Sequence, residues 1–521
     1  MTRRDVLRLM GAGAVAGTTG RLCFGQSPSS FVPDVELALR AGDGDARILP
    51  GPLTRVWRFT GEVLKGPPQS LQVISNSYLG PILRLRKGQK VRIRFTNGLP
   101  EPSIVHWHGM DMPSAMDGHP HSVIDPLQEF IYEFEVTNRA GTYWYHPHPH
   151  SRTGPQVYSG LAGLLLVSDA EERALNLPSG LEEIVCVLQD RTFDAGNQLT
   201  YVSGGMSGMM EHAQGFLGDR ILVNGSERPS VALATRAYRF RLLNGSNARI
   251  YKLAWSDGTP LTVIGTDGGL LQRPIEQPYL TLAPGQRADV ILDLSRRAVG
   301  TSFELRSAPY SFDAVDAMGM MQMGMGRGMG LGMGRGMNMP QPSVPNGALL
   351  SLLTVHVDRR EASAFHLPER LSTFDSSWEA APTAAPRRVT LNFQHGQWLL
   401  DGRTFAMHDT SRDEIVAAES TQIWEIVNGQ GMMGMQMAHP IHLHGRQFRV
   451  MSREGMSSAG AVVAQGFVDA GWQDTVLVMP GETVRIKIPF THHPGLYLYH
   501  CHILEHEDMG MMRNFRVVGA G

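Results

Sequence analysis

Cysteine is scarce in this 521-residue chain, which has only Cys23, Cys186 and Cys501. Three cysteines exclude a disulfide framework. An excess charge of one sign is also lacking, since 47 basic and 49 acidic residues leave a net charge of -2. That balance gives no basic surface, so we expect no nucleic-acid partner. No apolar run beyond the N-terminal segment is long enough to span a bilayer, so we expect a protein that is not membrane-embedded.

The N-terminal segment, residues 1–27, places Arg3 and Arg4 ahead of a weakly apolar stretch rich in Gly and Ala. The order TRRDVLR resembles the twin-arginine export signal. An ordinary secretion signal or a frayed terminus is the alternative. We therefore expect a periplasmic or otherwise exported protein that is soluble after removal of the segment.

A strand-like alternation that ends in Asn-Gly occurs three times, in VRIRFTNGLP, YRFRLLNGSN and QIWEIVNGQG. Each predicts a strand that enters a tight turn. A second repeated pair, PGQRADVILDL and PGETVRIKIPF, has the same character. Many short strands separated by Gly and Pro indicate an all-β protein of Greek-key β-sandwiches, here three in series.

The repeats define expected boundaries: the three sandwiches cover 45–170, 178–312 and 386–521. Between the second and the third lies a Met/Gly-rich insert, residues 313–345, which contains AMGMMQMGMGRGMGLGMGRGMNMP. This stretch has almost no β-branched residue, so we expect a low-complexity loop.

Eight of the twenty histidines form four H-x-H pairs, in the motifs HWHG, YWYHPHPH, HPIHLHG and HCH. Residues two apart on a strand point to the same face, so each pair presents two imidazoles to one place. Two pairs lie in the first predicted sandwich and two in the third, and the middle one is expected to be a spacer. Eight imidazoles suit a cluster of several metal ions, although imidazole alone does not choose between copper, zinc, iron and nickel.

The segment HCHILEHEDMGMM, residues 500–512, narrows the choice of metal. Cys501 lies between His500 and His502 and therefore points to the opposite strand face. One cysteine, two histidines and a weak axial methionine are the ligands of a blue-copper site. Met509, Met511 and Met512 are all available as that methionine.

These four motifs resemble the copper signatures of the multicopper oxidase family, and the resemblance covers nearly the whole chain after the signal. It implies cupredoxin-like sandwiches that hold four copper ions: one type 1, one type 2 and two type 3. The type 1 ligands would be His439, Cys501, His506 and Met511. Type 2 would be held by His106 and His442, one type 3 ion by His108, His146 and His502, and the other by His148, His444 and His500.

Two carboxylates, Asp117 and Glu507, also match acids that lie near the copper cluster in that family. Reduction of the expected partner, O2, to two waters consumes four protons, so a nearby acid is needed. We therefore expect catalytic proton transfer by these residues. One chain contains both halves of the cluster, and we expect a monomer.

The electron donor is the least determined feature. Nine methionines lie between 318 and 339, and Met435 and Met437 precede His439. Thioethers prefer Cu(I), so we predict a cuprous oxidase of copper tolerance, similar to the bacterial copper-efflux branch, with Met435 and Met437 near the substrate ion. An acid expected there by resemblance is missing, and Asp313 and Asp316 are candidate replacements. The alternatives are a laccase for phenols or aromatic amines, another small one-electron donor such as Fe(II), and a non-enzymatic scaffold or copper-storage protein.

Overall fold

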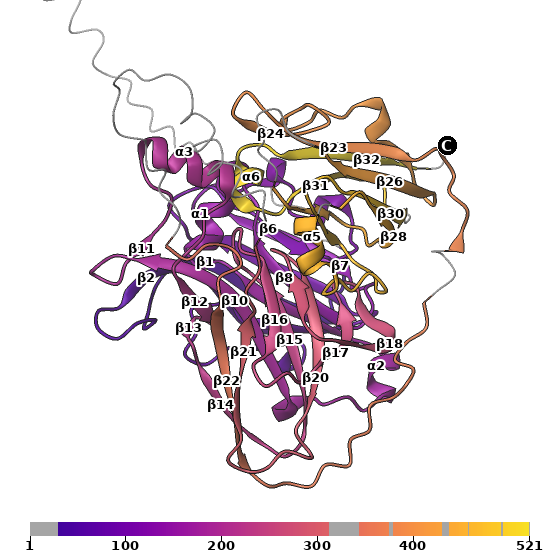
Figure 1. Cartoon of the computed structure of the whole chain (residues 1–521). Coiled ribbons are helices and arrows are strands. Elements are labelled where there is room, and N and C mark those ends of the chain that lie inside the picture. Colours follow the sequence, from indigo (N-terminus) through magenta and orange to yellow (C-terminus); the bar gives the residue numbers. More distant parts are fainter. Residues whose placement is uncertain are drawn as a thin grey trace, which may run out of the picture. The chain divides into compact units, whose positions relative to one another are not determined.

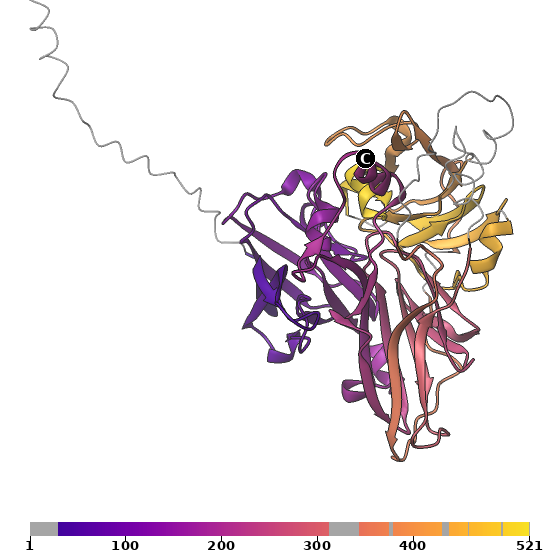
Figure 2. The ribbon, with the colours of Figure 1, turned by 60° about the vertical axis from the view of Figure 1, so that its left-hand side comes forward.

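The computed structural model describes residues 30–311, 343–374, 379–429, 437–456, 458–490 and 493–519. In these ranges strands predominate and helices are short, as Figures 1 and 2 show. The helices are α1 (Thr153–Tyr158), α2 (Ala170–Ala174), α3 (Gly205–Gln214), α5 (Ser458–Ala464), α6 (Leu504–Asp508) and the single turns η1 (Pro68–Ser70), η2 (Ser114–Met116), η3 (Pro120–Ser122), η4 (Gly180–Glu182) and η6 (Arg412–Glu414). None of the helices in the described part of the chain is long and apolar enough to cross a membrane.

The N-terminal sandwich has sheets of order β2-β1-β5-β7 and β3-β4-β9-β8-β6. In β5 the residues Val91, Ile93 and Phe95 are buried and alternate with more exposed ones, as a strand with one covered face requires. The first strand begins ten residues before the predicted start of the sandwich. The strands are β1 (Val35–Ala46), β2 (Thr54–Lys65), β3 (Leu71–Gln72), β4 (Ile82–Arg86), β5 (Lys90–Asn97), β6 (Val105–His108), β7 (Glu129–Glu135), β8 (Gly141–Pro147) and β9 (Gly163–Ser168).

The middle sandwich has sheets of order β13-β12-β10-β15-β20-β17-β18, with β11 beside β10, and β14-β22-β21-β16-β19. Because β22 pairs with β14 and β21, the chain returns to this sandwich after residue 342, beyond the predicted end at 312. The strands are β10 (Glu183–Phe193), β11 (Leu199–Thr200), β12 (Arg220–Val223), β13 (Ser226–Glu227), β14 (Ser230–Ala234), β15 (Ala237–Asn244), β16 (Tyr251–Trp255), β17 (Leu261–Thr266), β18 (Gly269–Gln277), β19 (Leu280–Leu282), β20 (Arg287–Asp293), β21 (Ser302–Ser307) and β22 (Leu350–Arg359).

The C-terminal sandwich has sheets of order β24-β23-β26-β30-β28 and β25-β32-β31-β27-β29. Three consecutive sandwiches of two sheets each confirm the predicted all-β class. The strands are β23 (Arg387–Gln394), β24 (Gln397–Leu400), β25 (Ile415–Ala417), β26 (Thr421–Asn428), β27 (His439–Leu443), β28 (Arg449–Glu454), β29 (Thr475–Val478), β30 (Thr483–Pro489), β31 (Gly495–Cys501) and β32 (Met512–Val518).

The three Asn-Gly repeats end three equivalent strands, because β5, β15 and β26 stop at Asn97, Asn244 and Asn428. Each asparagine side chain donates from Nδ2 to two main-chain carbonyls, for example those of Glu101 and Ile124 at 2.9 and 3.0 Å from Asn97. The asparagine thus closes the loop after its strand by side-chain bonds, rather than by the two-residue hairpin turn that the dipeptide suggests.

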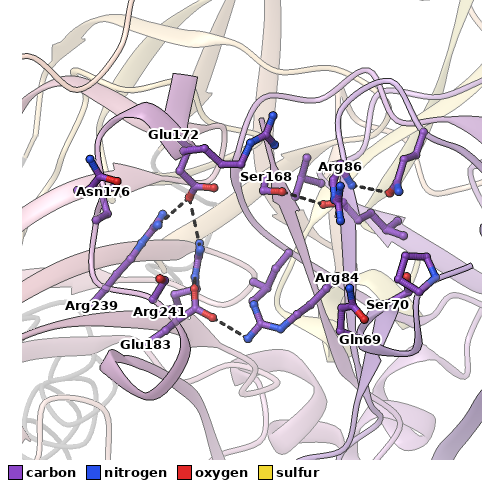
Figure 3. Close-up of a pocket in the computed structure, with 18 residues that line it drawn as sticks. Gln69, Ser70, Arg84, Arg86, Ser168, Glu172, Asn176, Glu183, Arg239 and Arg241 are labelled. Atoms are coloured by element: carbon purple, nitrogen blue, oxygen red, sulfur yellow. Dashed lines mark hydrogen bonds and ion pairs between the residues drawn. The ribbon is translucent and has the colours of Figure 1, made fainter. Parts of the chain in front are cut away.

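Ion pairs join the N-terminal and middle sandwiches beside a cavity of about 330 Å³ (Figure 3). Glu183 accepts from Arg84 and from Arg241, each at 2.7 Å, and Glu172 accepts from Arg239 at 2.6 Å. Arg239 and Arg241 also contact Asp289, so these three arginines face three carboxylates. The balanced charge makes the network a joint between sandwiches rather than a site for an anion.

Candidate metal centre

The four H-x-H pairs lie on two pairs of antiparallel strands or at their ends, since His148, His444 and His502 directly follow β8, β27 and β31. In the N-terminal sandwich β6 pairs with β8, so that His106 stands opposite His146. In the C-terminal sandwich β27 pairs with β31, so that His442 stands opposite His500. The sandwich cores cover the opposite faces of these strands, and all eight imidazoles of the pairs are at most 1% exposed. The eight rings are therefore shielded from solvent.

The two groups of histidines meet at the interface between the first and last sandwiches. His106 Nε2 lies 3.4 Å from His442 Nε2, and His500 Nε2 lies 3.3 Å from that of His148 and 3.0 Å from that of His444. Sets whose ligand atoms lie within 4.8 Å of one another are His106/His108/His442, His108/His146/His502 and His148/His444/His500. The structure thus brings together the histidines of each set that the family resemblance implies, and it places His108 near His106 and His442 as well.

Hydrogen bonding at the outer nitrogens shows that this group of rings fits metal ions. His106 donates from Nδ1 to the carbonyl of Asp117 at 2.7 Å, and His442 donates from Nδ1 to that of Asp474 at 2.8 Å. Each ring then turns an Nε2 lone pair toward the other, and burial lowers the pKa of both imidazoles, which opposes protonation. Facing lone pairs in a buried place need a cation between them, and imidazole is a good copper ligand.

Cys501 and two more histidines form a second group on the other face of β31. Cys501 Sγ lies 3.5 Å from His439 Nδ1 and 3.6 Å from His506 Nδ1. All three residues are fully buried, and burial raises the pKa of the Cys501 thiol far above its usual value. A buried thiol with two neutral imidazoles becomes a thiolate readily only when a metal cation joins them, and sulfur with nitrogen suits copper.

Burial and position together distinguish between the three candidate methionines, since Met511 and Met512 are both buried and only Met509 is partly exposed. Met511 is fully buried and packs in the same hydrophobic cluster as Cys501, and its carbonyl accepts from the Cys501 N–H at 3.0 Å. Met509 caps the end of α6 and is partly exposed. Met512 begins β32 opposite His500. These positions favour Met511 as the axial neighbour of the Cys501 group.

Asp117 lies between the histidines of the two outer sandwiches. Its Oδ2 accepts from His444 Nδ1 at 2.8 Å, whereas its Oδ1 has no hydrogen-bond partner among the described residues. Burial raises the pKa of Asp117 to about 8, and the opposing effect of Arg446 is smaller. A buried carboxyl group with one unpaired oxygen beside the histidine group is suited to hold a proton.

Glu507 lies on the opposite side of the same group, on helix α6. Its Oε2 is 3.2 Å from His500 Nδ1 and its Oε1 is 3.5 Å from His148 Nε2. Burial alone would raise the pKa of Glu507, but the positive charge that His148 and His500 can carry lowers it well below its usual value. Glu507 therefore contacts the two histidine pairs that converge there.

The predicted substrate residues are only partly placed. Met437 is half-buried against the C-terminal core, and its carbonyl accepts from Asn428 at 2.7 Å. Met435, Asp313, Asp316 and most of the 313–345 insert lie outside the described residues.

Sequence reasoning missed the groups that surround the histidines. Asp474 accepts from His108 Nε2 at 3.0 Å and pairs with Arg287 of the middle sandwich. Ala213 accepts from His506 Nε2 at 3.1 Å. Asp474 carries no motif, the PGQR repeat that contains Arg287 signals only a strand start, and a main-chain carbonyl has no sequence signature at all.

Known proteins share both the sequence and the fold. Family models described as multicopper oxidase match residues 56–172, 187–316 and 380–520. The multicopper oxidase mco of Staphylococcus haemolyticus is 31% identical over 446 residues, which cover 85% of this chain and 83% of the relative. Relatives named laccase match with similar identity.

Solved structures superpose over almost the whole chain. The McoA multicopper oxidase of Aquifex aeolicus has a TM-score of 0.74 and 32% identity, and the match covers 94% of this chain and 97% of that one. A multicopper oxidase from Campylobacter jejuni, described as a metallo-oxidase, has a TM-score of 0.71 and 26% identity over 93% and 91% of the chains. The sandwiches and the buried histidine and cysteine groups define a copper-dependent oxidoreductase. The chain belongs to the multicopper oxidase family.

Proposed function

We propose that this protein holds four copper ions and couples four one-electron oxidations of a donor to the reduction of O2 to two waters. The observation that carries the proposal is the alternation along β31. Cys501 faces the core of the C-terminal sandwich, while His500 and His502 on either side face the group of eight histidines. One short strand thus belongs to both proposed copper sites.

The proposal assigns the buried groups to the copper sites that the family resemblance implies. Copper bound there would accept single electrons at the cysteine site and deliver them to O2 at the histidine cluster. The type 1 ligands are His439, Cys501, His506 and Met511, the type 2 ligands are His106 and His442, and the type 3 ligands are His108, His146 and His502 for one ion and His148, His444 and His500 for the other.

The chain itself controls protons and water around the cluster. Burial of all eight cluster histidines excludes bulk water, so protons must come from groups already in place. Asp117, beside His444, and Glu507, between His148 and His500, are the proposed proton-transfer groups: Asp117 holds and donates a proton, and the ionised Glu507 accepts protons and passes them on. The four protons of each turnover would pass through these two carboxyl groups.

We propose Cu(I) as the donor, in a cuprous oxidase of copper tolerance. His439 and His506 are both fully buried, and α3 lies over His506, so a bulky aromatic donor has no ring edge to contact. A small ion needs no such contact, and the methionine-rich 313–345 insert supplies soft sulfur ligands. Export through the N-terminal segment would place this activity in the periplasm.

The test is a steady-state comparison of Cu(I), Fe(II) and a phenol as donors to copper-loaded protein, with and without added Cu(II). We expect blue absorbance, about four coppers per chain by the proposed ligand sets, and O2 uptake that is fastest with Cu(I). Faster turnover of the phenol would instead identify a laccase. Colourless loaded protein that takes up no O2 would leave only a scaffold or a copper store.

A further inference from the structure

Asp117 makes two hydrogen bonds with the histidine group, and the two histidines that it binds stack on each other. His106 donates from Nδ1 to its main-chain carbonyl at 2.7 Å. The His106 ring stacks on that of His444, with centroids 3.7 Å apart, and His444 Nδ1 donates to the Asp117 carboxylate at 2.8 Å. One aspartate therefore fixes two stacked histidines, one by its backbone and one by its side chain.

The same arrangement recurs around Asp474. His442 donates from Nδ1 to its main-chain carbonyl at 2.8 Å, and the His442 ring stacks on that of His108, with centroids 3.7 Å apart. His108 Nε2 donates to the Asp474 carboxylate at 3.0 Å. Each contact of Asp117 has its counterpart here, with the N-terminal and C-terminal sandwiches exchanged.

The two aspartates differ in what lies behind them. Asp474 forms a two-pronged ion pair with Arg287, whose Nη1 and Nη2 lie 2.8 and 2.5 Å from its two oxygens. The other three N–H donors of Arg287 bind the carbonyls of Thr142, Gly285 and Asp267. All five donors of the guanidinium group are used, so its position is fixed by the first and middle sandwiches together.

Packing leaves this ion pair no freedom to move. Gly109 has φ +87°, and a Cβ there would overlap both Asp474 Oδ2 and Arg287 Nη2. Glycine is therefore required at the last position of the HWHG motif, where it packs against the ion pair. Asp474 and Arg287 are also fully buried on their side chains, so neither exchanges its partner for water.

We propose that Arg287 and Asp474 are positioning residues of the metal centre, through which the middle sandwich selects the ring nitrogen that His108 and His442 each present. His108 gives its Nε2 proton to Asp474 and turns Nδ1 inward, and this Nδ1 has no hydrogen-bond partner among the described residues. His442 gives its Nδ1 proton and turns Nε2 inward. The inference rests on the proposed copper centre and adds to it a role for the sandwich that carries no predicted ligand.

The test uses Asp474→Asn and Arg287→Lys in the full-length, copper-loaded protein. We measure copper per chain, the type 2 EPR signal, and copper retention against a chelator, with blue absorbance as an internal reference for the Cys501 site. Groups that orient metal-binding histidines typically change metal affinity by about 10–100-fold. We expect that loss at the histidine cluster for Asp474→Asn, with blue absorbance retained. Arg287→Lys keeps the charge but not the two-pronged contact, so a smaller loss is expected.

The matched control is Arg249→Lys, because Arg249 and Asp190 form another fully buried ion pair of the middle sandwich, 2.8 Å apart, that does not contact the cluster histidines. The control should keep the type 2 signal. The inference is overturned if Asp474→Asn retains cluster copper as wild type does, or if Arg249→Lys loses it equally. If Asp474→Asn does not fold, Arg287→Lys replaces it in the test: the inference is overturned if Arg287→Lys retains cluster copper as wild type does, or if Arg249→Lys loses as much. Wild-type protein without bound copper would refute the proposed function instead.

Discussion

The imidazole of His506 and the main-chain carbonyl of Ala213 are joined across two sandwiches, at 3.1 Å between Nε2 and the oxygen and 293 residues apart in the chain. The same carbonyl accepts from Trp398 Nε1 at 2.8 Å. Ala213 lies in the last turn of α3, which contacts α6 (Figure 1). Helix α3 therefore covers the His506 side of the Cys501 group, and its Ala213 carbonyl orients that imidazole.

Replacing Trp398 by Phe should weaken the packing of helix α3 against the Cys501 group. The change removes the bond to the Ala213 carbonyl and alters ring packing on His439 and His506. We expect a loss of about 1–2 kcal/mol in the free energy of unfolding, as for a buried hydrogen bond, together with a shifted blue absorption band. Trp255→Phe is the control, since Trp255 is equally buried and its N–H has no acceptor among the described residues. An unshifted band in Trp398→Phe would contradict the prediction.

Cys501→Ser should abolish blue absorbance and donor oxidation, because a serine hydroxyl does not provide the soft, charged ligand that a thiolate does. Copper per chain should fall by one, while the type 2 EPR signal remains. Cys186→Ser is matched to it, since Cys186 is the other buried free cysteine of the described residues and lies in β10 of the middle sandwich. That variant should stay blue. Colour that survives in Cys501→Ser would refute the assignment of the thiolate.

Asp117→Asn should slow O2 reduction by about 100-fold or more, the usual range for loss of a general acid. Anaerobic reduction of the blue site by the donor should keep its wild-type rate, because Asp117 lies at the histidine cluster and not at Cys501. Stopped-flow measurement of both half-reactions separates the two effects. Asp111→Asn serves as the comparison, since Asp111 forms an ion pair with Arg446 at 3.1 Å and does not belong to any of the histidine groups found among the described residues. Equal slowing of both half-reactions would argue against proton transfer.

Replacement of all nine methionines between 318 and 339 by leucine tests the Cu(I) proposal while nearly preserving side-chain volume. Deletion of 313–345 is less suitable, because the carbonyls of Val344 and Pro345 accept from Arg249. We expect Cu(I) oxidation at low donor concentration to fall about tenfold, since thioethers bind this ion, with Fe(II) oxidation unchanged. Unchanged Cu(I) kinetics would remove the insert from the proposed donor path.

The free energy of unfolding at low pH should depend on Glu183, which belongs to the ion-pair network between the N-terminal and middle sandwiches (Figure 3). Burial alone would raise the pKa of Glu183, but Arg241 and Arg84 outweigh it and lower the pKa from 4.5 to about 2. The pKa of Glu183 is lower in the folded state than in the unfolded state. Its ion pairs therefore contribute fully to the free energy of unfolding above pH 4.5, and this contribution is lost as the pH falls toward 2. The shift corresponds to roughly 3 kcal/mol.

Glu183→Gln should therefore lower the free energy of urea unfolding by that amount at pH 7, with the difference from wild type shrinking between pH 4.5 and 2. Glu182→Gln is the neighbouring control, since Glu182 forms a partly exposed pair with Arg236, and solvent-screened pairs of this kind contribute little to stability. A difference that does not depend on pH would show that packing, not charge, stabilises the joint.

The sequence predicted those features of the fold and the site that depend on residues close together in the chain. Alternation with period two located the strands that end at Asn97, Asn244 and Asn428, because one covered face requires it. Likewise the H-x-H spacing implied shared strand faces before any distance was known. The family resemblance, not spacing, chose Met511 over Met509 and Met512, and its burial beside Cys501 agrees with that choice.

Partners distant in the sequence could not be predicted in the same way. Asp474 contacts His108 across 366 residues, and the return of β22 to the middle sandwich follows a long insert. Expecting that sandwich to be a spacer was reasonable, since it has no H-x-H pair. Its contribution is made by Arg287 and by the Ala213 carbonyl, whose roles depend only on where the finished fold places them.

Strand β31 alternates between two environments, and through this alternation both proposed metal sites depend on the same strand register. A slip of one residue against β27 would turn the thiol of Cys501 toward the imidazoles and would push His500 and His502 into an apolar core. A chain with this misalignment would therefore lose the expected blue absorbance and the proposed O2 reduction together. Correct pairing of β31 with β27 is therefore required for both proposed sites at once.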